Sequence, residues 1–282
     1  MKPEYIRTIV QLALAEDLGD GDITTDNLIP RHSHSQACLV AKGEGIICGV
    51  DLAREVFKVL NPKIIFRVLK KDGQKVLPGD LIAKVTGSTR ALLSAERVAL
   101  NFLSFLSGIA TQTNNYVNQI KPYKADILDT RKTTPLLRQI ERYAVRIGGG
   151  INHRFNLNDM VMIKDNHRLG CEGQSMVKVI DNLKKKTKTK IVVEVDTLKQ
   201  LKEILPSKVD IVLLDNMTPK KIAQAVKICA QAKSLVLLEA SGGITLKNIK
   251  RYAATGVDRI SVGALTHSRK ALDISMEFIR SS

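Results

Sequence analysis

The middle of the chain carries a group of side chains that are cationic or can become so. They are Arg131, Lys132, His153, Arg154 and Lys164. Arginine offers a planar fork that matches a carboxylate, and lysine offers a compact charge. Ion pairing with Asp129, Asp159 and Asp165 is the alternative, but these acids neutralise only part of the group. Because unpaired charges are costly inside a pocket, the pattern predicts a site for an anionic ligand.

Two carboxylates, Glu194 and Asp215, lie in the apolar runs that follow. Beside a cationic pocket, two acids suit a magnesium-bound diphosphate and the hydroxyl groups of a ribose. Magnesium keeps several waters and relies on substrate phosphates, so we expect Mg²⁺ to arrive with its substrate and no metal to be fixed by the protein alone. The alternative is that one of the two carboxylates is structural.

Two short glycine-containing segments follow the last apolar runs. They are Ser241-Gly242-Gly243 and Val262-Gly263-Ala264. Glycine lets backbone N–H groups approach a phosphate, and the N-terminus of a following helix favours the negative charge. Phosphate sites of β/α barrels lie after the late strands. These segments therefore predict the phosphate side of a site.

The elements that must position these residues are short apolar runs that recur from residue 125 onward. The runs cover residues 125–128, 160–163, 191–195, 209–214, 235–238 and 259–262. Helical segments separate the later runs, which predicts a parallel sheet covered on its faces. No Gly-x-Gly-x-x-Gly follows an early strand, so a β/α barrel is favoured over a dinucleotide-binding fold. With six runs visible, we expect an incomplete barrel or a cryptic strand near 151–155.

Such a barrel would bring the polar groups together, because reactive residues gather just past the carboxyl ends of its strands. One charge at a strand end is common by chance. Here nearly every run ends in a charged or glycine-rich segment, and that regularity favours a functional rim.

The first half of the chain has a different pattern. Residues 3–15 and 88–116 have helical apolar spacing, and residues 36–87 alternate and turn like β-structure with one helix at 51–60. The acidic and glycine-rich segment at 16–25 lacks the ligand spacing of a calcium loop, so we expect a structured loop there.

Composition narrows the classes of function. The chain has 282 residues with 44% hydrophobic residues and a net charge of +16, which indicates an anionic partner or only a very soluble surface. Aromatic residues are 4% and Trp is absent, which disfavours single-stranded nucleic acid. The densest basic run, at 184–190, reads as a solvated helix end before a strand.

The cellular context is also constrained. The four cysteines form no CxxC pair, and scattered thiols fit a reducing compartment. Neither a signal peptide nor an apolar run of about 18 residues is found, so we expect a cytoplasmic protein that binds neither membrane nor nucleic acid.

Eight segments resemble the quinolinate phosphoribosyltransferase (nicotinate-nucleotide pyrophosphorylase, carboxylating) family, in the family's order and over nearly the whole chain. They are EDLGDGDITT (16–25), ERVALN (96–101), TRKTTP (130–135), GGGINHR (148–154), KDNH (164–167), VEVD (193–196), LDN (214–216) and EASGGI (239–244). Taken jointly these segments are highly specific.

The resemblance implies a fold and a domain organisation. It implies an N-terminal open-faced α/β sandwich over 1–115 and an incomplete C-terminal α/β barrel over 116–270. For residues 271–282 we expect a C-terminal helix that packs back on the N-terminal domain. It also implies a homodimer with shared active sites. Assembly of such dimers into a higher oligomer is an open alternative.

The resemblance also assigns roles to residues. The cationic group matches the dicarboxylate pocket, with Thr133 beside it, and Arg97 matches an arginine supplied by the neighbouring subunit. The phosphoribosyl-diphosphate side comprises Glu194, Asp215, Ser241, Gly242, Gly243, Val262, Gly263 and Ala264. Within these sets, Glu194, Asp215, Lys132 and Lys164 are the expected catalytic residues.

The implied activity is phosphoribosyl transfer from 5-phosphoribosyl 1-diphosphate to quinolinate, with decarboxylation to nicotinate mononucleotide. One alternative is a related phosphoribosyltransferase that acts on another pyridine carboxylate. Another, from a different class, is a basic nucleic-acid-binding protein.

Overall fold

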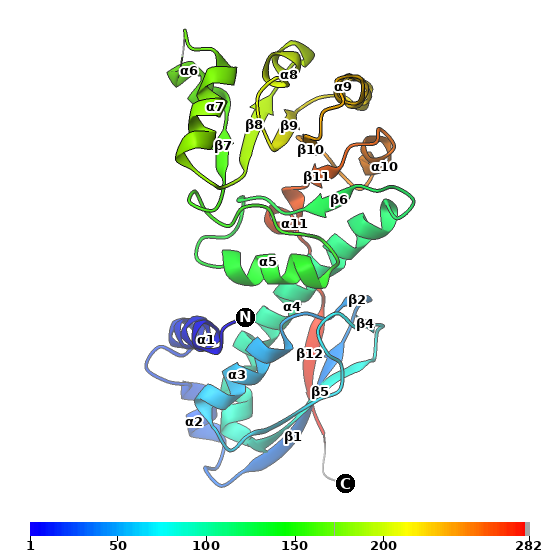
Figure 1. Ribbon diagram of the computed structural model, residues 1–282. Helices are drawn as coiled ribbons and strands as arrows, with labels where there is room; N and C mark the ends of the chain where they lie inside the picture. The colour runs from blue at the N-terminus through cyan, green and yellow to red at the C-terminus, as the bar shows by residue number, and fades with distance from the viewer. Residues whose placement is uncertain (172, 280–282) are drawn as a thin grey trace. The chain divides into compact units, whose positions relative to one another are not determined.

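The computed structural model describes residues 1–171 and 173–279. The chain forms two compact units. Unit 1 comprises Met1–Asn114, Leu136–Gly149 and Arg269–Ser282, and unit 2 comprises Asn115–Pro135 and Gly150–Ser268. Figure 1 labels the elements of both units.

Unit 1 is built on a four-stranded antiparallel sheet with the order β12-β1-β5-β3. Its strands are β1 (His34–Ala41), β3 (Ile65–Val68), β5 (Leu81–Ser88) and β12 (Ile274–Phe278). A short hairpin pairs β2 (Gly45–Ile46) with β4 (Lys75–Val76). The helices are α1 (Pro3–Leu18), α2 (Ile23–Leu28), α3 (Val50–Leu60), α4 (Thr89–Gln119) and α5 (Arg138–Ile147).

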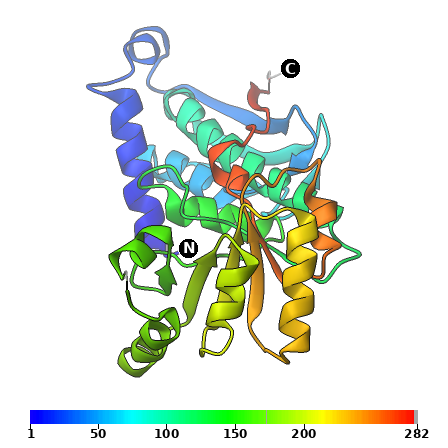
Figure 2. The same ribbon diagram turned by 90° about the horizontal axis from the view of Figure 1, so that it is seen from above.

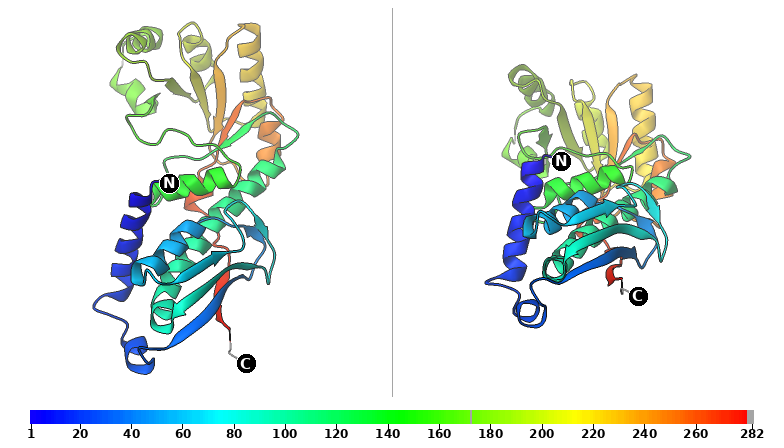
Figure 3. Two further views of the ribbon diagram at one scale, coloured as in Figure 1. Left: turned by 60° about the horizontal axis from the view of Figure 1, so that its bottom comes forward. Right: turned by 90° about the horizontal axis from the view of Figure 1, so that it is seen from below.

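The helices α3 and α4 cover one face of this sheet, as Figure 3 shows. The ring of Phe57 on α3 lies 5.8 Å from that of Phe66 on β3. The preceding residue of the strand, Ile65, points the other way and is 66% exposed, since side chains alternate along a strand. The predicted open-faced α/β sandwich is therefore confirmed.

The predicted C-terminal helix is wrong. Residues 274–278 form β12, which pairs antiparallel with β1 from Ala37↔Phe278 to Ala41↔Ile274. Apolar and polar residues alternate along this segment, and the period of two suits the edge of a half-covered sheet. The structure also differs from the predicted domain limits, because residues 136–149, which carry α5, belong to unit 1.

The acidic segment at 16–25 contains the expected loop and also the start of α2, whose N-cap is Asp22. The carboxylate of Asp22 accepts a hydrogen bond from Thr25 N (2.9 Å) and caps α2. It also accepts one from the Ser94 hydroxyl on α4 (2.9 Å). N-capping is a role for which aspartate is well suited, because its oxygen satisfies an orphan helix N–H.

The 31-residue helix α4 is long and apolar enough to cross a membrane by length and composition alone. However, 61% of its most apolar window is buried in the folded chain, as expected of a core helix. Leu92, Leu103 and Leu106 are among its fully buried side chains.

Unit 2 is built on a six-stranded parallel sheet with the order β6-β11-β10-β9-β8-β7. Its strands are β6 (Asp126–Leu128), β7 (Val161–Ile163), β8 (Ile191–Val195), β9 (Ile211–Asp215), β10 (Leu237–Ser241) and β11 (Arg259–Ser261). Its helices are α6 (Asp165–Gly170), α7 (Met176–Lys186), α8 (Leu198–Ile204), α9 (Pro219–Gln231), α10 (Ile249–Ala253) and α11 (Ala264–His267).

Figure 2 shows α7 to α10 along the outer side of the curved sheet. All six predicted strands are present, and the basic run at 184–190 is the end of α7 and the turn before β8, as predicted. At 151–155 the structure has a single parallel bridge, Leu128↔Ile151, in place of a further strand. The incomplete barrel predicted for this half of the chain is confirmed.

Candidate active site

The register of the parallel strands places four predicted site residues on one face and at one edge of the sheet. Asp215 is aligned with Ser241, and Glu194 with Leu213, two residues before Asp215. Because side chains alternate, Glu194, Asp215 and Ser241 point to the same side. Lys164 follows β7, and its Nζ lies 3.3 Å from Glu194 Oε2.

The two carboxylates share an environment that resists ionisation. Burial raises the pKa of Glu194, and the charge and hydrogen bond of Lys164 only partly oppose this. Burial and the charge of Asp196 raise the pKa of Asp215, while hydrogen bonds from Ser241 and Asn216 lower it. Since Glu194 and Asp215 also repel each other, the pair is prepared for a ligand that brings positive charge or hydrogen-bond donors.

The cationic side of the rim has an excess of positive charge. Arg154 is buried, with 6% exposure, and its guanidinium donates to Met160 O (3.1 Å). Burial lowers the pKa of Arg154, and the charge of Arg131 lowers it further, so the two guanidinium groups lie close enough to repel each other. Arg131, Lys132 and Lys164 are exposed. An anionic ligand would relieve this repulsion.

The late strands end in backbone that only glycine adopts easily. Gly242 and Gly243 have φ of +94° and +60°. A Cβ on Gly242 would lie 2.1 Å from Asn216 Oδ1, so the close approach of β9 and β10 also requires glycine. The helix after Gly243 starts at Ile249 and has five residues, and α11 has four, so the expected helix N-terminus contributes little beside these backbone groups.

Lys132 lies beside the third glycine. A Cβ on Gly263 would lie 3.4 Å from Lys132 Cδ, and the Thr266 hydroxyl donates to Lys132 O (2.6 Å). Thr133 N donates to Arg131 O (3.0 Å) in the same turn. The neighbours of Gly263, Val262 and Ala264, join β11 to α11. The structure thus brings the predicted lysine of the dicarboxylate group to the predicted phosphate side.

Two family models together cover nearly the whole chain. The quinolinate phosphoribosyl transferase N-terminal domain matches residues 22–107, and the C-terminal domain matches residues 109–277. The chain belongs to the quinolinate phosphoribosyltransferase family. The family resemblance expected from the sequence is confirmed, and so is the expected class of enzyme, a decarboxylating phosphoribosyltransferase of NAD biosynthesis.

Individual relatives agree with the family. A protein of Synechocystis named "Probable nicotinate-nucleotide pyrophosphorylase [carboxylating]" is 43% identical over 273 residues, 96% of this chain and 92% of that protein. A protein of Arabidopsis thaliana named "Nicotinate-nucleotide pyrophosphorylase [carboxylating], chloroplastic" is 40% identical over 292 residues, 98% of this chain and 83% of that protein. The crystal structure of NadC from Streptococcus pyogenes has a TM-score of 0.93 at 38% identity and covers 99% of each chain.

Arg97, which family resemblance assigns to the neighbouring subunit's site, lies in unit 1 on α4 and is exposed. Its charge lowers the pKa of Glu96, although burial raises that pKa overall. Among the described residues, Arg97 makes no ion pair within 4.0 Å. The structure therefore gives no support to a surface ion pair of Arg97 with Glu96 or another acid of the described chain, which would be the simple structural role for an exposed arginine.

Sequence reasoning missed a buried polar group behind the rim. Asp129 and Glu239 are fully buried, and both contact the segment that carries His153 and Arg154. The sequence shows that Asp129 and Glu239 each follow an apolar run. It does not show that the two carboxylates are buried.

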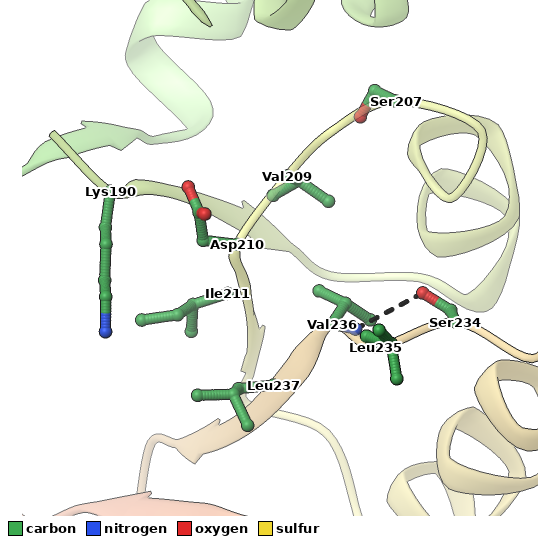
Figure 4. A pocket seen from close by; sticks show the side chains of 9 residues that line it. All are labelled: Lys190, Ser207, Val209, Asp210, Ile211, Ser234, Leu235, Val236 and Leu237. Carbon is green, nitrogen blue, oxygen red and sulfur yellow. Dashed lines mark hydrogen bonds between the residues drawn. The ribbon is translucent and has the colours of Figure 1, made fainter. Parts of the chain in front are cut away.

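A hollow in unit 2 lies away from these residues. It is lined at the amino ends of β8, β9 and β10 by Lys190, Asp210 and Leu237, among others (Figure 4). Asp210 already accepts hydrogen bonds from Ile191 N (2.7 Å) and from Lys184. This is the edge of a β/α sheet associated with stability, so we place the site at the opposite, carboxyl edge.

Proposed function

We propose that quinolinate and 5-phosphoribosyl 1-diphosphate react at the carboxyl edge of the β6–β11 sheet, with the residue roles that follow. The observation that carries this proposal is the charged cluster at this edge, where Lys164 Nζ lies 3.3 Å from Glu194 Oε2 and Asp215 is aligned with Ser241. The buried Arg154 also lies within electrostatic reach of the exposed Arg131. Two guanidinium forks within electrostatic reach of each other suit a dianion with adjacent carboxylates better than a monoanion. Lys132, Lys164, His153 and Thr133 complete this dicarboxylate side.

In the proposed reaction, the lone pair of the pyridine nitrogen forms a bond to C1 of the ribose. The C1–O bond to diphosphate breaks, and its electron pair leaves with the diphosphate. The positively charged ring nitrogen then accepts electron density as the bond from C2 to its carboxylate breaks. CO2 leaves, C2 takes a proton, and nicotinate mononucleotide remains.

Glu194 and Asp215 supply the negative charge that this reaction requires at the ribose. Positive charge grows on C1 and the ring oxygen as the diphosphate departs, and preorganised carboxylates stabilise it. Both carboxylates are half-buried and resist ionisation before substrate binds. Their effect is therefore larger when the developing charge is present than in the free enzyme.

The diphosphate side is proposed to consist of Lys132, Lys164 and the glycine ends of β10 and β11. Gly242 and Gly243 have positive φ, and Gly243 has open space where a Cβ would lie, so the backbone N–H groups of this turn suit a phosphate. Gly263, beside Lys132, is proposed to contribute in the same way. Lys132 and Lys164 balance the charge of the departing diphosphate, which makes them catalytic in this proposal.

Magnesium is proposed as the cofactor. Within residues 1–171 and 173–279, no cluster of three or more His, Cys, Asp or Glu side chains could hold a metal ion. The carboxylate pair Glu194 and Asp215 nevertheless offers hard oxygen ligands, and Mg²⁺ commonly binds through one or two carboxylates with substrate phosphates. When bound, the ion would neutralise diphosphate charge.

We further propose a cytoplasmic homodimer with shared sites. The exposed fork of Arg97, without an ion-pair partner in the described chain, supports a contact in trans. Neither a membrane nor a nucleic acid is needed for this function.

Product analysis tests the proposal. Purified protein, Mg²⁺, quinolinate and 5-phosphoribosyl 1-diphosphate should give nicotinate mononucleotide and CO2 in equal amounts. Nicotinate in place of quinolinate should give little product, and Arg154→Gln should remove the preference for the dicarboxylate. Tight binding of nicotinate with no preference for quinolinate would contradict the assignment of the cationic side.

A further inference from the structure

Glu239 is a carboxylate that the proposed mechanism does not use. It lies in β10 and is 0% exposed. Its strand neighbours in register are Leu213 and Arg259, so it points to the same side as Asp215 and Ser241 but lies deeper. Burial of an ionised carboxylate is costly unless several groups compensate, which makes its surroundings informative.

Three donor groups converge on this carboxylate. Ser261 Oγ donates to Oε1, His153 Nε2 lies 3.2 Å from Oε1, and Arg259 Nε lies 3.3 Å from Oε2. Burial alone would raise the pKa of Glu239, but His153, Ser261 and Arg259 together lower it. The hydrogen bond from Ser261 and the nearby His153 and Arg259 therefore favour the ionised form of Glu239, whose two oxygens can only accept.

The imidazole of His153 accepts a hydrogen bond at Nδ1 and faces Glu239 with Nε2. Arg154 N donates to His153 Nδ1 (2.7 Å), so in the neutral ring the proton resides on Nε2, which faces Glu239. The main chain is held as well, because Asp129 accepts from His153 N (2.7 Å) and from Asn152 Nδ2 (2.5 Å). His153 is 7% exposed.

These contacts link the main chain at Arg154, through His153, to Glu239 on β10. The backbone N–H of Arg154 depends on the orientation of the His153 ring, and that orientation depends on Glu239. We propose that Glu239, supported by Arg259 and Ser261, is a positioning residue that sets the affinity for quinolinate through His153 and Arg154. His153 itself thereby acts mainly through its orientation of the pocket backbone. This inference rests on the proposed function of the cationic side.

The test replaces the carboxylate without changing its shape. Glu239→Gln offers one acceptor oxygen, and its NH₂ group opposes either His153 and Ser261 or Arg259. We expect the Kd and KM for quinolinate to rise about tenfold or more, as when a group that orients a ligand-binding histidine is lost. The KM for 5-phosphoribosyl 1-diphosphate and kcat should stay within about threefold, since the carboxamide keeps the shape of the carboxylate and the proposed contacts to that substrate lie beyond Glu239, past the ends of β10 and β11.

Two controls accompany this variant. Glu203→Gln makes the same chemical change at an exposed ion pair with Arg168 and should leave every constant unchanged. If Glu239→Gln does not fold, Glu239→Asp takes its place, because it keeps the charge but shortens the reach toward His153. Its quinolinate Kd should rise in the same way. Thermal unfolding checks that each variant is folded.

Nitrogen-15 NMR of the imidazoles gives a readout that a merely structural role would not move. The chain has five histidines, so His153 can be assigned by its loss in His153→Gln. In the free wild-type enzyme, His153 should show the Nε2-protonated tautomer, and Glu239→Gln should shift it toward the other tautomer or toward an average of both.

The possible outcomes separate this inference from the proposed function. If the wild-type enzyme fails to bind quinolinate in calorimetry, the proposed function fails, while the NMR comparison still tests the link from Glu239 to His153. If wild type binds quinolinate but folded Glu239 variants bind it within twofold of wild type, the positioning role is overturned. Equal weakening of both substrates, or an unchanged His153 tautomer, would also overturn it.

Discussion

At the scale of single residues, burial of Glu194 and Asp215 lowers the stability of the folded protein, while their charge serves the proposed reaction. Burial raises the pKa of both, so the folded state binds protons more tightly than the unfolded state. The stability contribution of such groups falls as pH rises from the usual carboxyl values of 4.5 and 3.8 through the raised values. The burial penalty on the ionised forms therefore grows as the pH rises.

We therefore expect Glu194→Gln and Asp215→Asn to lower kcat by about 10²-fold or more while stabilising the free enzyme at pH 7. The affinity for quinolinate should change less than turnover. Urea unfolding at pH 7 and at pH 3 checks the sign, because the stabilisation should vanish where the carboxyl groups are protonated in both states. Unchanged turnover in both variants would remove them from the catalytic set.

The Arg131 and Arg154 pair makes a second prediction at this scale. Their repulsion is present in the free enzyme and should be relieved by a dicarboxylate. Quinolinate at 100 times its Kd should stabilise wild type by about 2.7 kcal/mol. Arg131→Gln should keep or raise the stability of the free enzyme but lose most of this ligand effect at the same concentration. Thermal unfolding with and without quinolinate measures both, and a full ligand effect in the variant would argue against the pair as a site.

At the scale of elements, β12 completes the sheet of unit 1 as an edge strand from the other end of the chain. It runs beside β1, with five aligned residue pairs, and the side chain of Ile274 is buried. A chain that ends at Asp273 would lose this side chain's burial, worth about 2 kcal/mol, along with the strand's hydrogen bonds. It would also expose β1 as an edge that invites pairing with other chains.

We expect this truncated chain to unfold at lower urea concentration and to aggregate at micromolar concentration. Size-exclusion chromatography and circular dichroism compare it with Glu277→Gln, which keeps the strand and changes only its exposed ion pair with Lys42. An unchanged midpoint after truncation would show that β12 is dispensable for the sheet.

Helix α5 makes a side-chain hydrogen bond to the turn between β3 and β4 of the same unit. Tyr143 OH donates to Asp72 Oδ2 (2.7 Å), and the other oxygen of Asp72 accepts from Gly49 N and Val50 N (both 3.0 Å) at the start of α3. Burial and the neighbouring Asp72 raise the pKa of Tyr143 well above its usual value, so it remains a donor.

Tyr143→Phe should therefore destabilise the protein by about 2 kcal/mol, the range for hydrogen bonds to charged groups. Urea unfolding measures this, and Tyr123→Phe at an exposed position serves as the matched control with no change. An equal effect of the two substitutions would mean that the bond to Asp72 does not hold α5.

At the scale of the whole molecule, the proposed role of Arg97 in trans has a complementation test. Arg97→Ala and Arg131→Ala homodimers should each be inactive. In a mixed dimer, one site receives Arg131 from the first subunit and Arg97 from the second, and activity should return to about a quarter of wild type after random mixing of subunits. Absence of rescue, with mixed dimers shown to form by mass spectrometry, would leave Arg97 acting within its own chain or not at all.

The charge of +16 is a further property of the whole molecule. Lysines recur along residues 176–233, where arginine is absent, and many lie on the exposed sides of helices. A surface with many lysines but neither arginine nor aromatic side chains beside them indicates solubility and attraction of small anions. We expect duplex DNA to bind more weakly than micromolar at physiological salt in fluorescence anisotropy, with a steep salt dependence. Micromolar affinity would favour a nucleic-acid role.

Local pattern was sufficient to predict the six apolar strands of unit 2 and the residue types at their carboxyl ends. Burial of a strand on both faces demands a continuous apolar run, and the run stops where the chain reaches the polar edge. Lys164, Glu194, Asp215 and Ser241 were found in this way. The family resemblance added Arg97, which no local pattern singles out.

Tertiary structure decided what depends on partners distant in sequence. The segment at 274–278 is a strand because β1, more than 200 residues earlier, offers it an edge. Residues 136–149 belong to unit 1, where Tyr143 bonds to Asp72 and the side chains of Ile140 and Val145 are buried. Glu239 is a buried anion because Ser261, His153 and Arg259 converge on it from two other strand regions. Non-local pairing and burial arise only when the chain has folded, since they depend on which surfaces meet and not on the order of residues within one segment.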